Sequence, residues 1–236
     1  MFIDIHCHVI WGVDDGGNTE EETLQMLRDA AADGIHKIIV TPHMTPGVYE
    51  FPEERFQLHL ARARRFVQEE GLNLELCCGA ELLYTDLTPR LLQERKVPTL
   101  DGTRHPLIEF SPTDSWEHIH DALQKVCRAG FSPIIAHMER YPAIKSTDQV
   151  RRLKESFQTL VQINARSLTK KQPLLRRKFF DRLFQENLTD FIATDTHSMP
   201  GRGTCMTEGM EALRKKYGEQ CADRILRNTE YIFGDD

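Results

Sequence analysis

Two histidines stand two residues apart near the start of the chain, at the end of a short apolar run. Between His6 and His8 lies Cys7. Because successive side chains of a β-strand point to opposite faces, the two imidazoles share one face and the thiol takes the other. Imidazole is a common metal ligand, and two aspartates, Asp14 and Asp15, follow in the adjoining glycine-rich loop. The spacing is compatible with a metal site, although a lone His-x-His pair is more often incidental.

Metal-capable side chains also stand at or just after the ends of the other apolar runs. A single acid in such a place is usually a helix cap or part of a solvated loop, and a single histidine can be a turn residue. Such residues at the end of nearly every apolar run need another explanation, because desolvating many ionisable groups at one edge costs free energy unless cations compensate it. We therefore expect a multinuclear centre, whose mixed ligands suit manganese, iron or zinc better than calcium. The residues concerned are His43, Glu81, Glu109, His137, Asn164, Asp195 and His197.

The elements that must position these residues alternate along the chain. Short β-branched runs are followed by longer amphipathic stretches, which is typical of repeated βα units and a parallel sheet. Parallel barrels build their active sites at the C-terminal rim of the strands. We predict one domain over residues 1–236, a distorted (β/α)7 TIM-like barrel with the metal site at that rim; an open doubly wound sheet is the alternative. The predicted strands cover residues 2–8, 36–41, 73–80, 106–110, 133–137, 160–164 and 190–195.

The predicted helices have recognisable start and stop signals. Thr19 and Glu22 form a capping-box pattern, and Gly34 ends the first helix. Pro52 opens the second, which Gly71 ends. The remaining helices are predicted over residues 86–96, 115–129, 147–158, 170–187 and 206–228, the last with a break near Gly218.

Composition excludes several classes of protein. With 236 residues, 40% hydrophobic and 28% charged, the chain is neither disordered nor fibrous. Its apolar runs are far shorter than the ~18 residues of a membrane span, and no basic segment follows Met1, so we expect a cytoplasmic protein without a signal peptide or stable membrane insertion. The net charge of −6 disfavours nucleic acid as a partner.

The six cysteines include no C-x-x-C pair, and we interpret them as reduced thiols. Cys221 and Arg227 have the C-x5-R spacing of thiol-dependent phosphatases, but the residues between them lack glycine and continue a helical pattern. We attribute that spacing to chance. The remaining histidines are interpreted as packing or surface residues: His36, His59, His105, His118 and His120.

Taken together, these motifs resemble the polymerase-and-histidinol-phosphatase (PHP) superfamily, and more closely the bacterial manganese-dependent protein tyrosine phosphatases of capsule and exopolysaccharide operons. The resemblance runs in order from residue 1 to about residue 205, and the combination is specific although no single motif is. It rests on Asp4-Ile5-His6-Cys7-His8, Val13-Asp14-Asp15-Gly16, Thr41-Pro42-His43, Gly79-Ala80-Glu81, His137-Met138-Glu139-Arg140-Tyr141, Gln162-Ile163-Asn164, and Asp195-Thr196-His197 with Arg202.

The resemblance implies roles for individual residues. Three divalent metals are implied, with manganese favoured over iron or zinc: one held by His6, His8 and Asp195; a second, to which Glu81 bridges, held by Glu109 and His137; a third held by His43, His197 and Asp15. Asp14 is the less expected ligand of its loop, although spacing does not separate it from Asp15. Arg140 and Arg202 are implied to bind the substrate phosphate, which suits their forked donors.

The resemblance also implies an activity, metal-dependent hydrolysis of phosphotyrosine in proteins. The implied partner is the tail of a membrane-associated tyrosine autokinase of polysaccharide export, and a homo-oligomer is compatible with it. Three rivals are weaker: a histidinol-phosphatase-like small-molecule phosphomonoesterase, a metal-dependent amidohydrolase, for which no lysine stands at a strand end, and a module with a purely structural metal. Three divalent ions would offset the net charge of −6, so the sign of charge at the site is expected to be positive.

Overall fold

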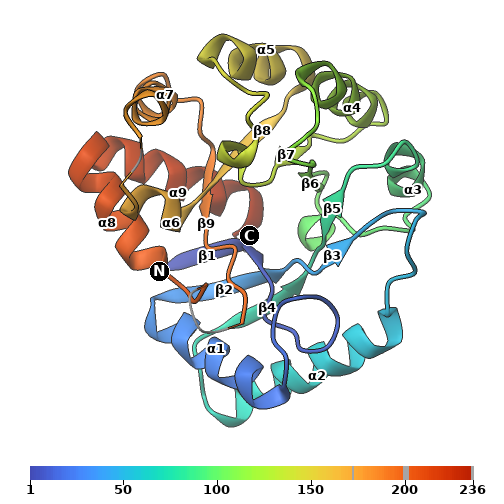
Figure 1. Cartoon of the computed structure of the whole chain (residues 1–236). Coiled ribbons are helices and arrows are strands. Elements are labelled where there is room, and N and C mark those ends of the chain that lie inside the picture. Colours follow the sequence, from blue (N-terminus) through green and yellow to red (C-terminus); the bar gives the residue numbers. More distant parts are fainter. Residues whose placement is uncertain (172, 199–201, 235–236) are drawn as a thin grey trace.

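Parallel strands form a ring, and helices surround it (Figure 1). The computed structural model describes residues 1–171, 173–198 and 202–234. In these ranges no helix is both long and apolar enough to cross a membrane. The strands are β1 (Phe2–Cys7), β2 (Ile35–Val40), β3 (His43–Met44), β4 (Glu75–Cys78), β5 (Glu81–Leu83), β6 (Leu107–Glu109), β7 (Ile134–Ile135), β8 (Leu160–Asn164) and β9 (Phe191–Ala193).

The strand pairs follow one another around the ring in two sheets. One sheet has the order β1-β2-β4 and the other β3-β5-β6-β7-β8-β9, with every pair parallel. The Gly79 amide donates to the carbonyl of Val40 (2.9 Å) and the Glu81 amide to that of Pro42 (3.1 Å), so the β2–β4 pairing of the first sheet runs on into the β3–β5 pairing of the second. A parallel bridge between Cys7 and Thr196 joins the last strand run to the first, where the Asp195 amide donates to the carbonyl of His6 (2.9 Å). The fold is the predicted distorted barrel of seven strand runs.

Two of the predicted strands are bent, and each is divided into two. The strand predicted over residues 73–80 is confirmed as β4, but the chain continues beyond it as β5, which belongs to the other sheet, and β3 likewise follows the run predicted to end at residue 41. Pro42 has no amide hydrogen to donate to a ladder. At Gly79 a Cβ atom would lie 2.9 Å from side chains of both Ile39 and Leu100, so only glycine allows the close packing at the bend.

Helices cover the outside of the ring. At α1 the Thr19 hydroxyl accepts from the Glu22 amide (3.2 Å), but the Glu22 carboxylate accepts from the Asn18 amide (2.8 Å) and not from Thr19, so the predicted capping box is only half formed. The predicted helix over residues 170–187 is wrong at its start, because Pro173 caps a separate helix. The predicted break at Gly218 is confirmed. The helices are α1 (Glu20–Ala32), α2 (Glu53–Glu69), α3 (Thr88–Gln93), α4 (Trp116–Arg128), α5 (Thr147–Phe157), α6 (Ala165–Thr169), α7 (Leu174–Gln185), α8 (Met206–Tyr217) and α9 (Glu219–Phe233), with 3-10 turns η1 (Leu100–Gly102) and η2 (Met138–Arg140).

The interior of the barrel is apolar at one end and polar at the other. Buried apolar side chains from all around the ring, including Ile5, Leu107 and Phe191, form one cluster. Two residues further along β6 stands Glu109, on the same face as Leu107 because strand side chains alternate. The same alternation puts the polar residues Gln162 and Asn164 on the same face of β8 as Leu160, further along the strand. The polar half of the interior therefore lies at the C-terminal mouth.

Candidate metal centre

Two histidines at the floor of the mouth direct ring nitrogens at one carboxylate. The Oε1 atom of Gln162 accepts from the His137 amide (2.7 Å), so His6 Nδ1, 3.1 Å from the same oxygen, must be its donor. His8 Nδ1 donates to Asp14 in the same way (2.8 Å). Both Nε2 atoms are thereby left as acceptors, yet they lie 3.1 Å apart and 3.2 and 3.4 Å from Glu81 Oε2. Acceptors facing one another in this way fit a bound cation.

Glu81 is the centre of this arrangement. Its carboxylate is fully buried, and neither oxygen makes a hydrogen bond of acceptable geometry. His137 Nε2, also without a hydrogen bond, lies 2.7 Å from Oε1. Burial raises the pKa of Glu81, but His6, His137 and His43 outweigh it and hold the pKa well below its usual range. A buried carboxylate without hydrogen bonds is costly unless a cation compensates it, so the residues present fit a metal.

The upper part of the cluster is more open to solvent. The side chain of Asp15 is 65% exposed and that of His43 37%, whereas His197 is buried. Asp15 Oδ1 lies 3.3 Å from Nε2 of both histidines. Three groups of candidate ligand atoms lie within 4.8 Å of one another, and they share members: His6, His8 and Glu81; His43, Glu81 and Glu109; His8, Asp15, His43 and His197.

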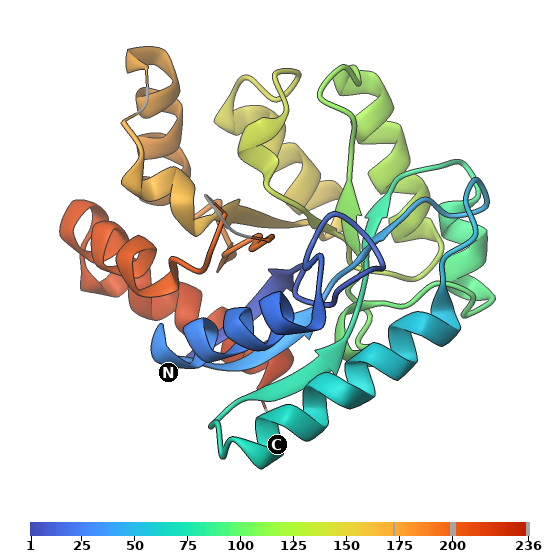
Figure 2. The same cartoon turned by 60° about the horizontal axis from the view of Figure 1, so that its bottom comes forward.

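The first loop separates its two aspartates. Asp14 accepts from His8 Nδ1, from the Gly16 amide (2.9 Å) and from the His43 amide (3.1 Å), so its oxygens are already engaged. Asp15 faces two ring nitrogens and belongs to a candidate ligand group. This loop joins β1 to α1, and in Figure 2 it is the dark blue segment that arches over the strands. The sequence left open which of the two aspartates is the ligand. In the structure Asp14 orients His8, and Asp15 lies in a candidate ligand group.

Two arginines converge on one carboxylate at the edge of the cluster. Arg140 donates to Asp195 Oδ2 (2.6 Å) and Arg202 to Oδ1 (2.9 Å), and each arginine side chain is about 40% exposed. Asn164 Nδ2 also donates to Asp195 (2.7 Å). Burial raises the pKa of Asp195, but His6 and Arg140 outweigh it and hold the pKa below its usual range. The structure thus brings both predicted arginines to the site, on its solvent side.

Two residues of the site were missed from the sequence. Gln162 is buried, orients His6 and the His137 amide, and donates to Asn164 (2.7 Å). Its signal was available, because it stands two residues before Asn164 in the same predicted strand. Tyr141 places its hydroxyl 3.2 Å from His137 Nδ1, and no sequence pattern indicated that contact.

The backbone is unusual at two of the predicted ligands. His137 has φ 29° and Asp195 φ 53°, both in the left-handed region that side chains rarely adopt. Each residue follows the end of a short strand, β7 and β9 respectively. Such conformations cost free energy and cluster at functional sites.

The remaining sequence candidates lie elsewhere. Cys221 is buried within α9, and the helix continues through Arg227, so the C-x5-R spacing forms no phosphate-binding loop. His59 is more than a packing residue: its ring stacks on Trp11 (centroids 3.9 Å apart), and its Nδ1 donates to the Trp11 carbonyl (2.8 Å), which ties α2 to the loop that carries Asp15.

Fold and cluster together define a class of protein, the α/β barrels with a cluster of candidate metal ligands at the C-terminal mouth. The model of a family described as capsular polysaccharide synthesis, CpsB/CapC, matches residues 2–233. The chain belongs to this family.

Individual relatives agree with that assignment. The tyrosine-protein phosphatase CpsB of Streptococcus agalactiae is 32% identical over 98% of this chain and 97% of its own. A solved structure from work on YwqE of Bacillus subtilis and CpsB of Streptococcus pneumoniae, described as unique metal-dependent tyrosine phosphatases, superposes with a TM-score of 0.88 at 27% identity over 100% of this chain and 96% of that one. The histidinol phosphate phosphatase of Lactococcus lactis has the same fold, with a TM-score of 0.58 at 13% identity over 93% of each chain.

Proposed function

We propose that the chain is a metal-dependent protein-tyrosine phosphatase. The observation that carries the proposal is the Glu81 carboxylate, which is buried without a hydrogen bond among four imidazoles, with two arginines at the solvent edge of the same cluster. Full-length similarity to proteins named tyrosine-protein phosphatases supports the choice of substrate.

The proposed ligand set is the one implied by the sequence. Three divalent ions, with manganese favoured, would be held by His6, His8, Asp195, Glu81, Glu109, His137, His43, His197 and Asp15. All but two of these residues belong to the candidate ligand groups; Asp195 and His137 lie beside them, 3.7 Å from His6 and 2.7 Å from Glu81. Such ions supply a nucleophile derived from water at neutral pH and neutralise charge on the phosphoryl oxygens. The protein's part is to fix the ligands: Gln162 and Asp14 hold His6 and His8 in the tautomer that presents Nε2.

Arg140 and Arg202 have the role of binding the phosphate. Each guanidinium carries five N–H donors, and the structure shows each using one of them on Asp195. The remaining donors are free to pair with phosphoryl oxygens in a forked geometry. Because Asp195 fixes both side chains, substrate binding does not have to order them first. The tyrosine leaving group has a pKa of ~10 in free form, so a strong protein acid is not required.

The physiological substrate that we propose is the tail of a membrane-associated tyrosine autokinase of capsule or exopolysaccharide synthesis. Membership of a capsular polysaccharide synthesis family supports this choice. A cytoplasmic location is part of the proposal, because such a tail would be reached there.

The test is turnover of a phosphotyrosine peptide by protein stripped of metal and then reloaded. Mn²⁺ is expected to restore phosphate release, with a phosphoserine peptide of the same sequence and histidinol phosphate as comparison substrates. If no divalent ion supports hydrolysis of phosphotyrosine, or if histidinol phosphate is the better substrate, the proposed function is wrong.

A further inference from the structure

Positive charge is concentrated in one segment of an otherwise acidic chain. Residues 166–182 contain seven arginines and lysines against a single acid, Asp181. The segment contributes +6 to a chain of net charge −6, so the remaining residues carry −12. Like charges gathered in this way repel one another, and a folded protein gains nothing from them unless a negative partner is present.

This segment is attached to the mouth of the barrel. It follows β8, whose last residue Asn164 contacts Asp195. From α6, Ser167 donates to the Glu139 carboxylate (2.7 Å) and Arg166 to the Gly203 carbonyl (2.6 Å), while Arg176 of α7 donates to the Glu139 carbonyl (2.6 Å). Glu139 and Gly203 are the neighbours in sequence of Arg140 and Arg202. The segment therefore holds the backbone beside both phosphate-binding arginines.

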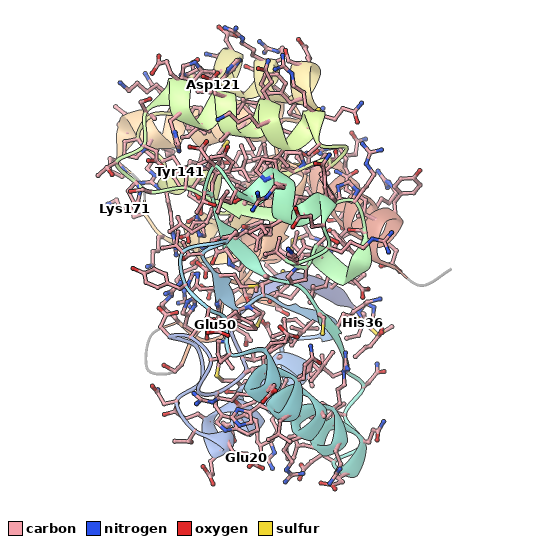
Figure 3. All side chains as sticks on the ribbon, turned by 90° about the vertical axis from the view of Figure 1, so that its right-hand side faces the viewer. Glu20, His36, Glu50, Asp121, Tyr141 and Lys171 are labelled. Atoms are coloured by element: carbon pink, nitrogen blue, oxygen red, sulfur yellow. The ribbon has the colours of Figure 1, made fainter. Side chains whose placement is uncertain are left out.

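The position of the basic segment on the molecule agrees with these contacts. Figure 3 shows Lys171 and Tyr141 toward the same edge of the molecule, whereas His36, at the start of β2 and thus at the opposite end of the barrel, lies toward the other edge. Tyr141 directly follows the η2 turn that carries Arg140. In Figure 1, α6 lies between the ends of β8 and β9 and the helix α8.

Four of the cationic side chains near this segment line a cleft of about 150 Å³. Lys170, Lys171 and Arg177 are exposed, and in the described part of the chain they make no ion pair, whereas Lys216 pairs with Asp181 (2.8 Å). No acid is among the residues that line the cleft, whose walls are completed by apolar groups such as Phe180 and Tyr217.

From this juxtaposition we infer that the cleft of Lys170, Lys171, Arg177 and Lys216 binds carboxylate side chains that flank the phosphotyrosine in the substrate peptide. The inference rests on the proposed function and deepens it, because it names the class of peptide that the enzyme prefers. The phosphotyrosine occupies the two arginines at the mouth, and an acidic stretch of the same peptide continues along α6 into the cleft. Charge complementarity carries the assignment.

A peptide suits this surface better than a membrane does. The cationic side chains line a concave cleft, which admits the side chains of an extended chain but offers a lipid surface few contacts. Among the described side chains of this segment, the most exposed apolar one is that of Leu174 (59%), and a peripheral membrane helix requires a broad apolar face.

The experiment compares two phosphotyrosine peptides that differ only in their flanks, one with aspartate and glutamate and the other with asparagine and glutamine. For the wild-type enzyme loaded with Mn²⁺ at low salt, we expect a KM roughly three- to tenfold lower for the acidic peptide, and a loss of that difference at about 0.5 M salt. The double variant Lys170→Gln/Arg177→Gln is expected to remove the difference. Its turnover of p-nitrophenyl phosphate should stay that of wild type, because neither residue contacts the phosphate-binding arginines.

The matched control is Arg65→Gln/Arg152→Gln, which removes the same charge from exposed positions on α2 and α5. It should keep the preference. Equal KM values for both peptides with wild type, or a preference that survives in the cleft variant, would overturn the inference. So would binding to phosphatidylglycerol vesicles that the cleft variant loses while its peptide preference is intact. If no phosphotyrosine is hydrolysed at all, the proposed function fails instead, and fluorescence anisotropy of the two labelled peptides still tests the cleft.

Discussion

His43 and Glu81 are partner residues of the parallel ladder between β3 and β5, and His43 Nδ1 lies 3.0 Å from Glu81 Oε2. Both residues belong to short strands that exist because the preceding strands bend at Pro42 and at Gly79. The bend therefore fixes the separation of two candidate ligands through backbone pairing, which side-chain packing alone would define less closely.

Replacing Glu81 by glutamine is expected to remove metal from the centre. The amide preserves the shape but carries no charge, so the cations lose the carboxylate that two of the candidate groups share. We expect fewer ions per chain by plasma mass spectrometry and a fall of at least about 100-fold in phosphatase turnover. Glu94→Gln, an exposed acid on the outside of the barrel, is the control. A full metal complement in Glu81→Gln would contradict the assignment.

Much of the site could be predicted because strand side chains alternate. Leu107 and Glu109 share the inner face of β6, and the same rule applies to Gln162 and Asn164 on β8. The polar residues at strand ends therefore include the candidate ligands that the structure brings together. It could not recover the division of labour between Asp14 and Asp15, because that depends on which oxygen meets which ring across the mouth.

The bends of the strands and the contact that supports the first loop could not be predicted from the sequence, because they depend on residues far apart in the chain. The requirement for glycine at position 79 comes from Leu100, 21 residues further along the chain, and the brace on the first loop comes from His59 on α2. Contacts between residues so far apart in sequence leave no periodic pattern. The start of α7 is different, since Pro173 was a visible stop signal within the predicted helix.

Lysine is not expected to perform the role of either arginine at the mouth. Arg140→Lys or Arg202→Lys keeps the positive charge but loses the forked donors that bind Asp195 and phosphate together. We expect kcat/KM on a phosphotyrosine peptide to fall roughly 10- to 100-fold while the number of bound ions is unchanged. Arg152→Lys on α5 should behave as wild type. Unaltered kinetics in both mouth variants would show that phosphate is bound elsewhere.

Gly16 is expected to tolerate no side chain. A Cβ atom there would lie 2.2 Å from the His8 carbonyl oxygen and 2.8 Å from Asp14 Oδ1. Gly16→Ala must therefore displace the loop that carries both aspartates, at a cost of about 1–3 kcal/mol in unfolding free energy, and weaken metal binding measured by calorimetry. Gly130→Ala, at φ 98° but in open space, should lower stability without changing metal affinity. Equal metal affinity in the two variants would refute this account.

His105 is expected to make stability depend on pH. Burial and the nearby Arg104 lower the pKa of His105 below 6.5, although the Ser132 carbonyl opposes them. Just below pH 6.5 the unfolded chain therefore binds a proton at His105 more readily than the folded chain does. The contribution of neutral His105 to the free energy of unfolding is complete above pH 6.5 and is lost as the pH falls below it. In EDTA, His105→Gln should flatten the decline of unfolding free energy between about pH 7.5 and 5.5 relative to wild type. Parallel curves for the two proteins would contradict the prediction.

Asp14 and Asp15 are expected to fail in different ways when each is replaced by asparagine. Asp15→Asn replaces the carboxylate that faces His43 and His197 by a neutral amide, so the centre should lose an ion outright, seen as a lower number of bound ions at saturating Mn²⁺. Asp14→Asn instead weakens the hold on His8 Nδ1 and on the His43 amide. All ions should still bind at saturation, but with about 10- to 100-fold lower affinity, because the ring that presents Nε2 is no longer oriented. Asp29→Asn, in α1 and outside the candidate ligand groups, controls for the loss of one negative charge. The opposite pattern, a missing ion in Asp14→Asn and only weaker binding in Asp15→Asn, would exchange the two roles.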